Sequence, residues 1–304
     1  MNVLVGGGNL IGIGGSENYS YTMIHELHKR GINVDGFSAT SNGKPLLSKK
    51  IKELGVKLYV EEPPTTKYDL ILSSNKTTVE PISFVDGFRI HTFHGIHVNE
   101  EQPWKVADVD VSISEETQSH LEQTYNITSH LIRNGVDTDR FSPTKPINKT
   151  IKNVLSLAHS GELNHRLEII FDKLGINFTY KEKINNTSFN VEDYINDADL
   201  VITIGRGVYE AMSCGRVVLI LDDRKYVGCG SIGDGIVTDK NIDYFIQNNC
   251  SGRYTNKVFT DEGIINELSK YDYHLGEFGR DYVQKHLTIE QSVDKYLELY
   301  EQLR

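Results

Sequence analysis

The segment from 199 to 221 constrains the fold more than any other part of the chain. Leu200–Ile204 is a continuous apolar run, as expected for a strand buried on both faces of a sheet. Gly205-Arg206-Gly207 follows, and these glycines let the backbone turn sharply and approach a ligand closely. We expect a short helix over Val208–Cys214, ended by a glycine, and a second buried strand over Val217–Leu221. This order is typical of a parallel α/β sheet.

A glycine turn that opens a helix favours an anion. The backbone N–H groups and the positive end of the helix point toward whatever lies over the strand ends, and a phosphate is the preferred ligand. The candidate nucleotide-binding residues are therefore Gly205, Arg206, Gly207 and Val208. Glu210 lies about one turn into the helix, where its carboxylate can accept hydrogen bonds from sugar hydroxyls.

Strands alternate with helices along the whole chain, which predicts doubly wound parallel sheets. The length of 304 residues is sufficient for two domains. We predict a first domain over 1–143 and a second over 151–284, joined by the polar, proline-containing segment 142–150. One long helix is expected over 279–303.

Composition excludes several classes of protein. The chain contains 38% hydrophobic residues, enough for a globular fold. No apolar run approaches the roughly 20 residues that span a bilayer, and the first residues lack the features of a signal peptide. The net charge of -10 disfavours unspecific binding to nucleic acid or anionic lipid. Three cysteines without metal-ligand spacing indicate the cytoplasm, with peripheral association with a membrane as the alternative.

A second glycine-rich loop ends in Gly14-Gly15-Ser16-Glu17, directly before an expected helix from about Ser16 to Arg30. This is generic phosphate-binding geometry. Asp35 lies about 20 residues on, so a dinucleotide cofactor is a rival interpretation.

The sequence from Gly205 to Val218, GRGVYEAMSCGRVV, resembles the donor-nucleotide motif of family 4 glycosyltransferases. Asn134-Gly135-Val136-Asp137, followed by Phe141-Ser142-Pro143, resembles a signature at the domain junction of that family. The resemblance implies the GT-B fold: two Rossmann-like domains that face each other across a cleft. It also implies a retaining transferase and a final helix, about 285–304, that packs back on the first domain.

The resemblance also implies roles for individual residues. Glu210 corresponds to the glutamate that holds the ribose, and His94 to a histidine near the donor sugar, so both are candidate catalytic residues. Gly14, Gly15 and Glu17 would face the donor phosphates and the acceptor, and Asn134 with Asp137 would shape the edge of the cleft.

Two family features are missing. The arginine and lysine that many members use to neutralise the diphosphate are absent from the region of 159–166, and Ile202 stands where a first glutamate is common. We include Ser160 and Arg166 among the donor-binding residues, and Arg166 or Arg206 is expected to replace the missing cations. The glycine-rich segment 226–238 is expected to form a mobile loop, in which Asp234 could touch the sugar.

No metal site is expected. Asp108-Val109-Asp110 has the Asp-x-Asp form that binds metal in another glycosyltransferase fold, but here it leads a buried strand. His91, His94 and His97 lack a carboxylate partner at ligand spacing.

The resemblance therefore implies a metal-independent, retaining, hexosyltransferase-type glycosyltransferase. It would use a nucleotide-sugar, UDP- or GDP-linked, as co-substrate, with no bound cofactor. Alternatives are a non-catalytic nucleotide- or sugar-binding GT-B protein, an epimerase or phosphorylase of the same fold, and a nucleic-acid-modifying glycosyltransferase. Nucleic acid is the less favoured partner because the chain carries a net negative charge.

Overall fold

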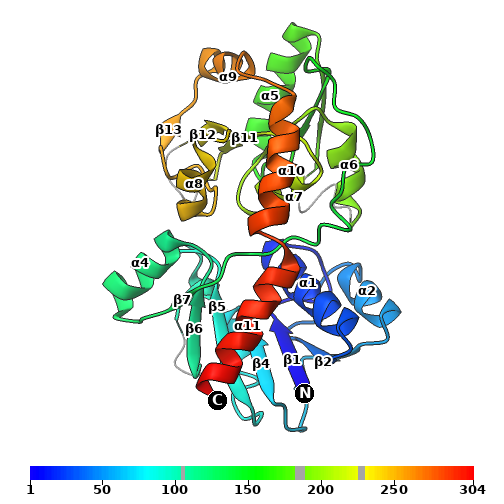
Figure 1. Cartoon of the computed structure of the whole chain (residues 1–304), viewed down its shortest axis with the longest axis vertical. Coiled ribbons are helices and arrows are strands. Elements are labelled where there is room, and N and C mark those ends of the chain that lie inside the picture. Colours follow the sequence, from blue (N-terminus) through cyan, green and yellow to red (C-terminus); the bar gives the residue numbers. More distant parts are fainter. Residues whose placement is uncertain (104–106, 182–188, 225–229) are drawn as a thin grey trace. The chain divides into compact units, whose positions relative to one another are not determined.

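The computed structural model describes residues 1–103, 107–181, 189–224 and 230–304. The chain divides into two compact units. The first comprises Met1–Gly135 together with Ile289–Arg304, and the second comprises Val136–Thr288 (Figure 1).

The first unit is built on a parallel sheet of seven strands in the order β3-β2-β1-β4-β5-β6-β7. Val3, Leu4 and Val5 in the central strand are each at most 2% exposed, because helices and loops cover both faces of a parallel sheet. The strands are β1 (Asn2–Gly7), β2 (Asn33–Ser38), β3 (Lys57–Val60), β4 (Leu70–Ser73), β5 (Phe88–Phe93), β6 (Val109–Ser112) and β7 (His130–Leu131).

Helices α1 (Gly15–Lys29) and α11 (Ile289–Leu303) lie side by side in the first unit (Figure 1). A buried chain of hydroxyl groups joins them to the sheet. The Tyr19 hydroxyl donates to the Tyr296 hydroxyl at 2.8 Å, and Thr92 Oγ1 of β5 lies 2.7 Å from the same oxygen. The last sixteen residues thus pack in the first unit. Its other helices are α2 (Leu47–Glu53), α3 (Lys76–Val79), the 3-10 turn η1 (Asn99–Glu101) and α4 (Glu115–Tyr125).

The second unit is built on a six-stranded sheet in the order β13-β12-β11-β10-β8-β9. Four strands are parallel, whereas β12 and β13 run antiparallel to their neighbours. Ile202 and Leu219 are paired in the centre and fully buried. The strands are β8 (Asn153–Ser156), β9 (Asn177–Tyr180), β10 (Leu200–Thr203), β11 (Val217–Asp222), β12 (Ile232–Ile236) and β13 (Lys257–Val258).

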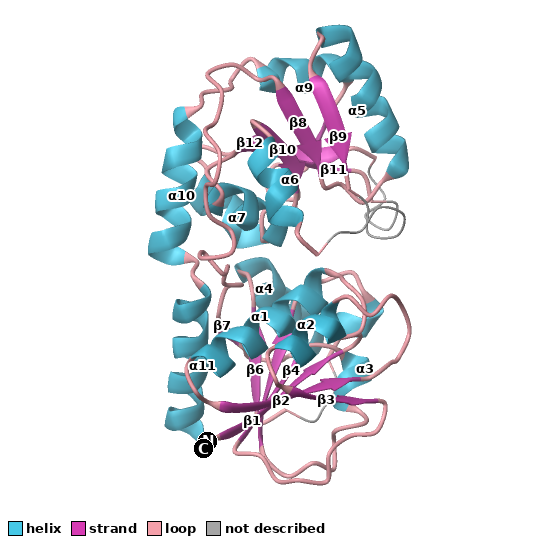
Figure 2. Ribbon diagram, turned by 90° about the vertical axis from the view of Figure 1, so that its right-hand side faces the viewer, coloured by secondary structure: helices cyan, strands magenta, loops and turns pink. Residues whose placement is uncertain are grey.

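Two apolar clusters cover the two faces of this sheet. One joins Leu167 and Ile264, from α5 and α9, to the β10 residue Ile202. The other joins Met212 and Val283, from α7 and α10, to Val201, and Figure 2 shows the helices on either side of the strands. The helices are α5 (Gly161–Leu174), α6 (Val191–Asp197), α7 (Arg206–Ser213), α8 (Ile242–Phe245), η3 (Ile246–Asn248), α9 (Asp261–Leu268) and α10 (His274–His286).

Several expectations from the sequence need correction. The long helix expected over 279–303 is interrupted, because Val136 N–H donates to the Leu287 carbonyl and Val136 forms a parallel bridge with Thr288. The segment expected as a loop over 226–238 contains strand β12, while 226–229 lie outside the described residues.

The segment expected as a linker, 142–150, is hydrogen-bonded within the second unit. Thr144 N–H donates to Asn196 Oδ1, and Asn148 N–H donates to Asp199 Oδ1. The boundary between the units lies earlier, at 135/136.

Candidate functional site

Each sheet contains a point where the order of the strands reverses. In the first sheet β1 lies between β2 and β4, and in the second sheet β8 lies between β9 and β10. Ligands of doubly wound sheets bind outside the carboxyl ends of the strands at such a point. The loops that follow β1 and β10 carry the two glycine-rich turns found in the sequence.

The turn after β10 requires both of its glycines. Gly205 adopts φ 58° and ψ -132°, a conformation that side chains other than glycine rarely tolerate. A Cβ atom on Gly207 would lie 2.3 Å from Thr203 Oγ1. Helix α7 begins at Arg206, two residues earlier than expected, so the turn leads directly into the first turn of the helix.

Arg206 and Glu210 form an ion pair across one turn of α7. Arg206 Nε donates to Glu210 Oε1 at 2.7 Å, and both side chains are about nine-tenths buried. The predicted ribose-binding carboxylate is therefore held in place by the predicted phosphate-binding arginine. Val208, the fourth predicted residue, is fully buried in the core and contributes its backbone only.

The start of α5 lies at the same edge of the sheet, after β8. The Ser160 hydroxyl caps this helix by accepting a hydrogen bond from Leu163 N–H at 3.2 Å. The neighbouring His159 N–H donates to Asp222 Oδ1 at the end of β11. Ser160 thus supports the helix start, and its predicted contact with the donor stays a prediction.

Asp222 and Arg224 form a charged pair that sequence reasoning missed. Asp222 is 1% exposed, and its burial raises the pKa of the carboxyl group. Arg224 Nε lies 3.3 Å from Asp222 Oδ2, and the guanidinium group also donates to the Ser251 carbonyl. The signal in the sequence was available, since charged residues follow a buried strand at the edge where ligands bind.

Arg166 forms its hydrogen bonds near β12 and β13, in another part of the second unit. Its guanidinium group donates to Asp261 Oδ1, to Ser231 Oγ and to the Phe259 carbonyl at 2.6 to 3.0 Å. These contacts join α5 to the segments around β12 and β13. A role in binding the donor would require Arg166 to exchange them.

The glycine loop of the first unit leads into α1. Gly14 is the N-cap residue in an extended conformation, and no side chain caps the helix. A Cβ atom on Gly15 would meet no heavy atom within 4 Å, which leaves space beside the helix start. Glu17 lies in the first turn, with the Ser16 hydroxyl 3.3 Å from its Oε2.

His94 lies beside α1, in the segment that follows β5. Its ring packs edge-on against Tyr19, with ring centroids 4.6 Å apart. His91 is 1% exposed within β5, and its Nδ1 lies 2.8 Å from Ser73 Oγ. Burial lowers the pKa of His91 to about 4. Within the first unit, the structure thus brings His94 next to the helix that Gly14 and Gly15 open.

Asn134 and Asp137 lie on either side of the unit boundary. Asn134 is 5% exposed. Asp137 Oδ1 accepts hydrogen bonds from the N–H groups of Asp139 and Arg140 and so stabilises the turn that enters the second unit.

The Asp-x-Asp pair is part of the first sheet. Asp108 Oδ2 accepts a hydrogen bond from Arg89 N–H at 2.7 Å. Asp110 pairs with His91 across β5 and β6, and burial raises the pKa of its carboxyl group to about 6. Within the described ranges, no group of three or more His, Cys, Asp or Glu residues is arranged to hold a metal ion.

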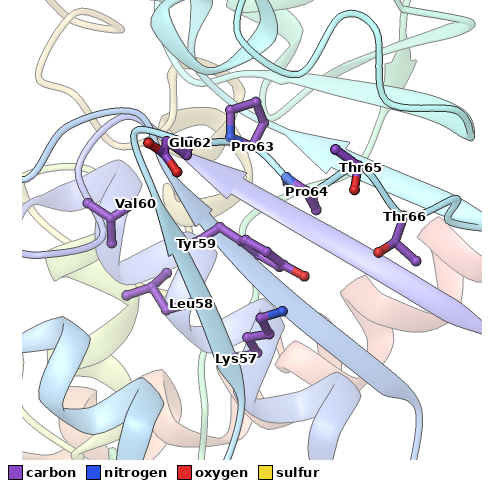
Figure 3. Close-up of a pocket in the computed structure, with 9 residues that line it drawn as sticks. All are labelled: Lys57, Leu58, Tyr59, Val60, Glu62, Pro63, Pro64, Thr65 and Thr66. Carbon is purple, nitrogen blue, oxygen red and sulfur yellow. The ribbon is translucent and has the colours of Figure 1, made fainter.

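A cavity of about 470 Å³ lies along the edge strand β3 (Figure 3). Lys57 and Glu62 are its charged lining residues, and the Lys57 ammonium group lies 4.2 Å from the centroid of the Tyr59 ring. The cavity contains none of the predicted site residues. A narrower cavity lies at the carboxyl ends of β1 and β4, where hydroxyl groups of Tyr19, Ser20 and Ser73 line it.

No protein-family model and no curated protein matches this sequence. Solved structures do match the fold. A glycosyltransferase from Rickettsia africae ESF-5 has a TM-score of 0.63 at 14% identity, over 99% of this chain and 98% of that chain. An α-glucosyltransferase in complex with UDP and a 13-mer DNA has a TM-score of 0.64 at 10% identity, over 99% of both chains.

MurG of Acinetobacter baumannii has a TM-score of 0.55 at 11% identity, again over 99% of both chains. These likenesses extend over both units and establish the GT-B fold, with two Rossmann-like α/β domains. Across the part of the chain that the structure describes, no helix is both long and apolar enough to cross a bilayer.

Proposed function

We propose that this chain is a glycosyltransferase that binds a nucleotide-diphosphate sugar at the carboxyl edge of the second sheet. It would transfer the hexosyl group to an acceptor with retention of configuration. The start of α7 carries the proposal, because the Gly205 turn, the Arg206 guanidinium group and the Glu210 carboxylate meet there. The shared fold with solved glycosyltransferases supports it.

The charge at this helix start favours a bound anion. The N-terminus of α7 carries a partial positive charge, which favours an anion by about 0.3–1 kcal/mol. Arg206, the first residue of α7, is neutralised by Glu210, and its guanidinium group would donate further hydrogen bonds to a diphosphate. Arg224, at the end of the neighbouring strand β11, would add a second cation.

Glu210 is proposed to hold the ribose. Arg206 Nε engages Oε1 of the carboxylate, and an ionised carboxylate has about four acceptor positions. It can therefore accept hydrogen bonds from the two ribose hydroxyls while the ion pair persists. Because the side chain is already fixed in a buried ion pair, little conformational entropy would be lost on binding.

The proposed chemistry places the developing negative charge of the leaving diphosphate at the start of α7. Backbone N–H groups and guanidinium groups that are already oriented stabilise such charge efficiently. Gly14, Gly15, Glu17 and His94 would bind the acceptor side. Retention and independence of metal ions rest on the resemblance to family 4. The anomeric configuration of the product and activity in the presence of a chelator test them.

Nucleotide binding to matched variants tests the donor site. We expect Glu210→Gln to raise the Kd for UDP or GDP roughly 10- to 100-fold, because hydrogen bonds to a charged acceptor are lost. Glu26→Gln is the control. The buried Glu26 of α1, in the other unit, likewise pairs with an arginine four residues further on, with Arg30 Nε at 2.6 Å.

Each outcome tests a different part of the proposal: the role of Glu210, the donor site, the catalytic activity or the acceptor. Equal Kd values for both variants would remove Glu210 from the site, and a wild-type protein that binds no nucleotide would refute the donor site itself. Nucleotide binding without transfer or donor hydrolysis would favour a non-catalytic binding protein. Transfer to DNA would favour the nucleic-acid-modifying alternative, against which the net charge of -10 weighs.

A further inference from the structure

The segment 248–256, called here the strained loop, has an unusual backbone. Asn249, Cys250 and Asn256 have positive φ angles of 52°, 47° and 49°, and Gly252 has φ 81°. Glycine and asparagine enter this region readily, whereas cysteine does so rarely, so the strain lies at Cys250. Such a conformation persists only where the surroundings hold it, and it often marks a functional site.

Asp234 of β12 holds the strained loop. Its Oδ2 accepts a hydrogen bond from Gly252 N–H at 3.0 Å, and its Oδ1 accepts from Thr255 N–H at 2.8 Å. Thr255 Oγ1 lies 3.1 Å from the same Oδ1. Asp234 is 8% exposed, so these contacts use the carboxylate as an internal anchor. The sequence suggested instead that Asp234 touches the sugar.

The strained loop in turn holds the Gly205 turn. Gly205 N–H donates to the Cys250 carbonyl at 3.0 Å, and a Cβ atom on Gly205 would lie 3.5 Å from Asn249 Nδ2. The Tyr209 hydroxyl in α7 donates to Asn249 Oδ1 at 3.1 Å. The loop therefore contacts both the residue before α7 and a residue one turn inside it.

The same loop also holds Arg224. The guanidinium group of Arg224 donates to the Ser251 carbonyl at 3.0 Å. Three consecutive residues of the loop, 249–251, thus connect the start of α7 with the cation that follows β11. A shift of the loop would move both groups together.

We propose that Asp234 is a positioning residue for nucleotide binding, which acts through the strained loop. By fixing residues 249–256, it sets the direction of the N–H groups at the start of α7 and the place of the Arg224 guanidinium group. This inference rests on the proposed donor site and adds a specific residue to it. Asp234 itself makes no contact with the nucleotide.

The test compares Asp234→Asn with Asp199→Asn. Asp199 is 2% exposed, and its carboxylate accepts hydrogen bonds from the N–H groups of Asn148, Lys152 and Asn153. It lies just before β10, at the end of that strand opposite the Gly205 turn. Both variants remove a carboxylate that is at most 8% exposed and that accepts backbone hydrogen bonds in the second unit. Only Asp234 is connected to the proposed site.

The measurement is the Kd for UDP by calorimetry, at a temperature well below the Tm of every variant. We expect both variants to lower the Tm, but only Asp234→Asn to raise the Kd, about 10- to 100-fold, as small displacements of binding groups do. If the wild type binds UDP and both variants bind it equally well, Asp234 has a structural role only. If the wild type binds no nucleotide, the proposed function fails instead.

If Asp234→Asn does not fold, a second pair of variants that perturbs the loop less tests the same proposal. Thr255→Val removes the hydroxyl group that donates to the Gly233 carbonyl at 2.8 Å and lies 3.1 Å from Asp234 Oδ1, whereas Thr255→Ser retains both contacts. A weaker Kd in the valine variant that serine restores would support the inference, and equal Kd values in the two would overturn it.

Discussion

Replacing Asp110 with asparagine should stabilise the protein, and the gain should depend on pH. Burial raises the pKa of this carboxyl group from 3.8 to about 6. The difference corresponds to about 3 kcal/mol between the folded and unfolded states. Because the side chain is only partly buried, screening by solvent reduces this figure, and we expect a net gain of about 1–2 kcal/mol above pH 6.

The sign follows from the protons that each state binds. Between about pH 4 and pH 6 the folded protein holds a proton on Asp110 that the unfolded chain has lost, so stability falls as pH rises through this window. Above it the penalty is constant. The asparagine variant lacks this fall, so its advantage over the wild type should grow from about pH 4 to about pH 6 and then level off.

His91, the partner of Asp110 across the two strands, has the opposite effect. Its pKa is lowered from 6.5 to about 4, so its contribution to stability rises with pH through nearly the same window. The difference between wild type and variant is therefore the quantity to measure, since His91 is present in both. Urea denaturation at a series of pH values provides it. A difference that is independent of pH, or a variant less stable than the wild type at pH 8, would refute the reasoning.

Two further predictions concern packing. Gly276→Ala should destabilise the second unit by about 1–3 kcal/mol, because its Cβ atom would lie 2.2 Å from the Gly215 carbonyl oxygen. Gly263→Ala should be neutral or stabilising in the same thermal denaturation experiment, because its Cβ atom would make only ordinary contacts, at 3.4 Å from Thr260 Oγ1 and 3.6 Å from the Phe259 ring. Tyr296→Phe should cost about 1–3 kcal/mol, because it removes a buried hydroxyl group bonded to two others. Tyr300→Phe on the same helix should cost less than about 0.5 kcal/mol, and equal losses for the two tyrosines would argue against the buried hydroxyl chain.

Local patterns were enough to predict much of the fold. The largely apolar run at Leu200–Ile204 predicted β10, which the structure has at Leu200–Thr203, because a strand buried on both faces is apolar at most of its positions. The helix expected from about Ser16 to Arg30 is α1, which the structure has at Gly15–Lys29. Both signals depend on residues that are neighbours in the sequence.

Features that depend on distant residues were missed. Strand β12 has two glycines within five residues, and glycine is unfavourable in strands. The structure explains Gly233, because a Cβ atom there would lie 2.2 Å from the Ile220 carbonyl oxygen on β11. Likewise, the helix expected over 279–303 is interrupted where Thr288 pairs with Val136, which is far away in the sequence.

The candidate site also contains features that local sequence patterns predict and features that depend on distant residues. The sequence alone determined the glycine turn at Gly205 and the glutamate at Glu210, because a strand, a glycine turn and a helix in this order create a place for an anion. Asp222 and Arg224 carried a signal that sequence reasoning did not use, and only the tertiary structure brought in the strained loop anchored by Asp234. Gly205 and Cys250 are 45 positions apart in the sequence, yet they share a hydrogen bond. Contacts of this kind form only when the sheet aligns the ends of its strands, and no local pattern encodes them.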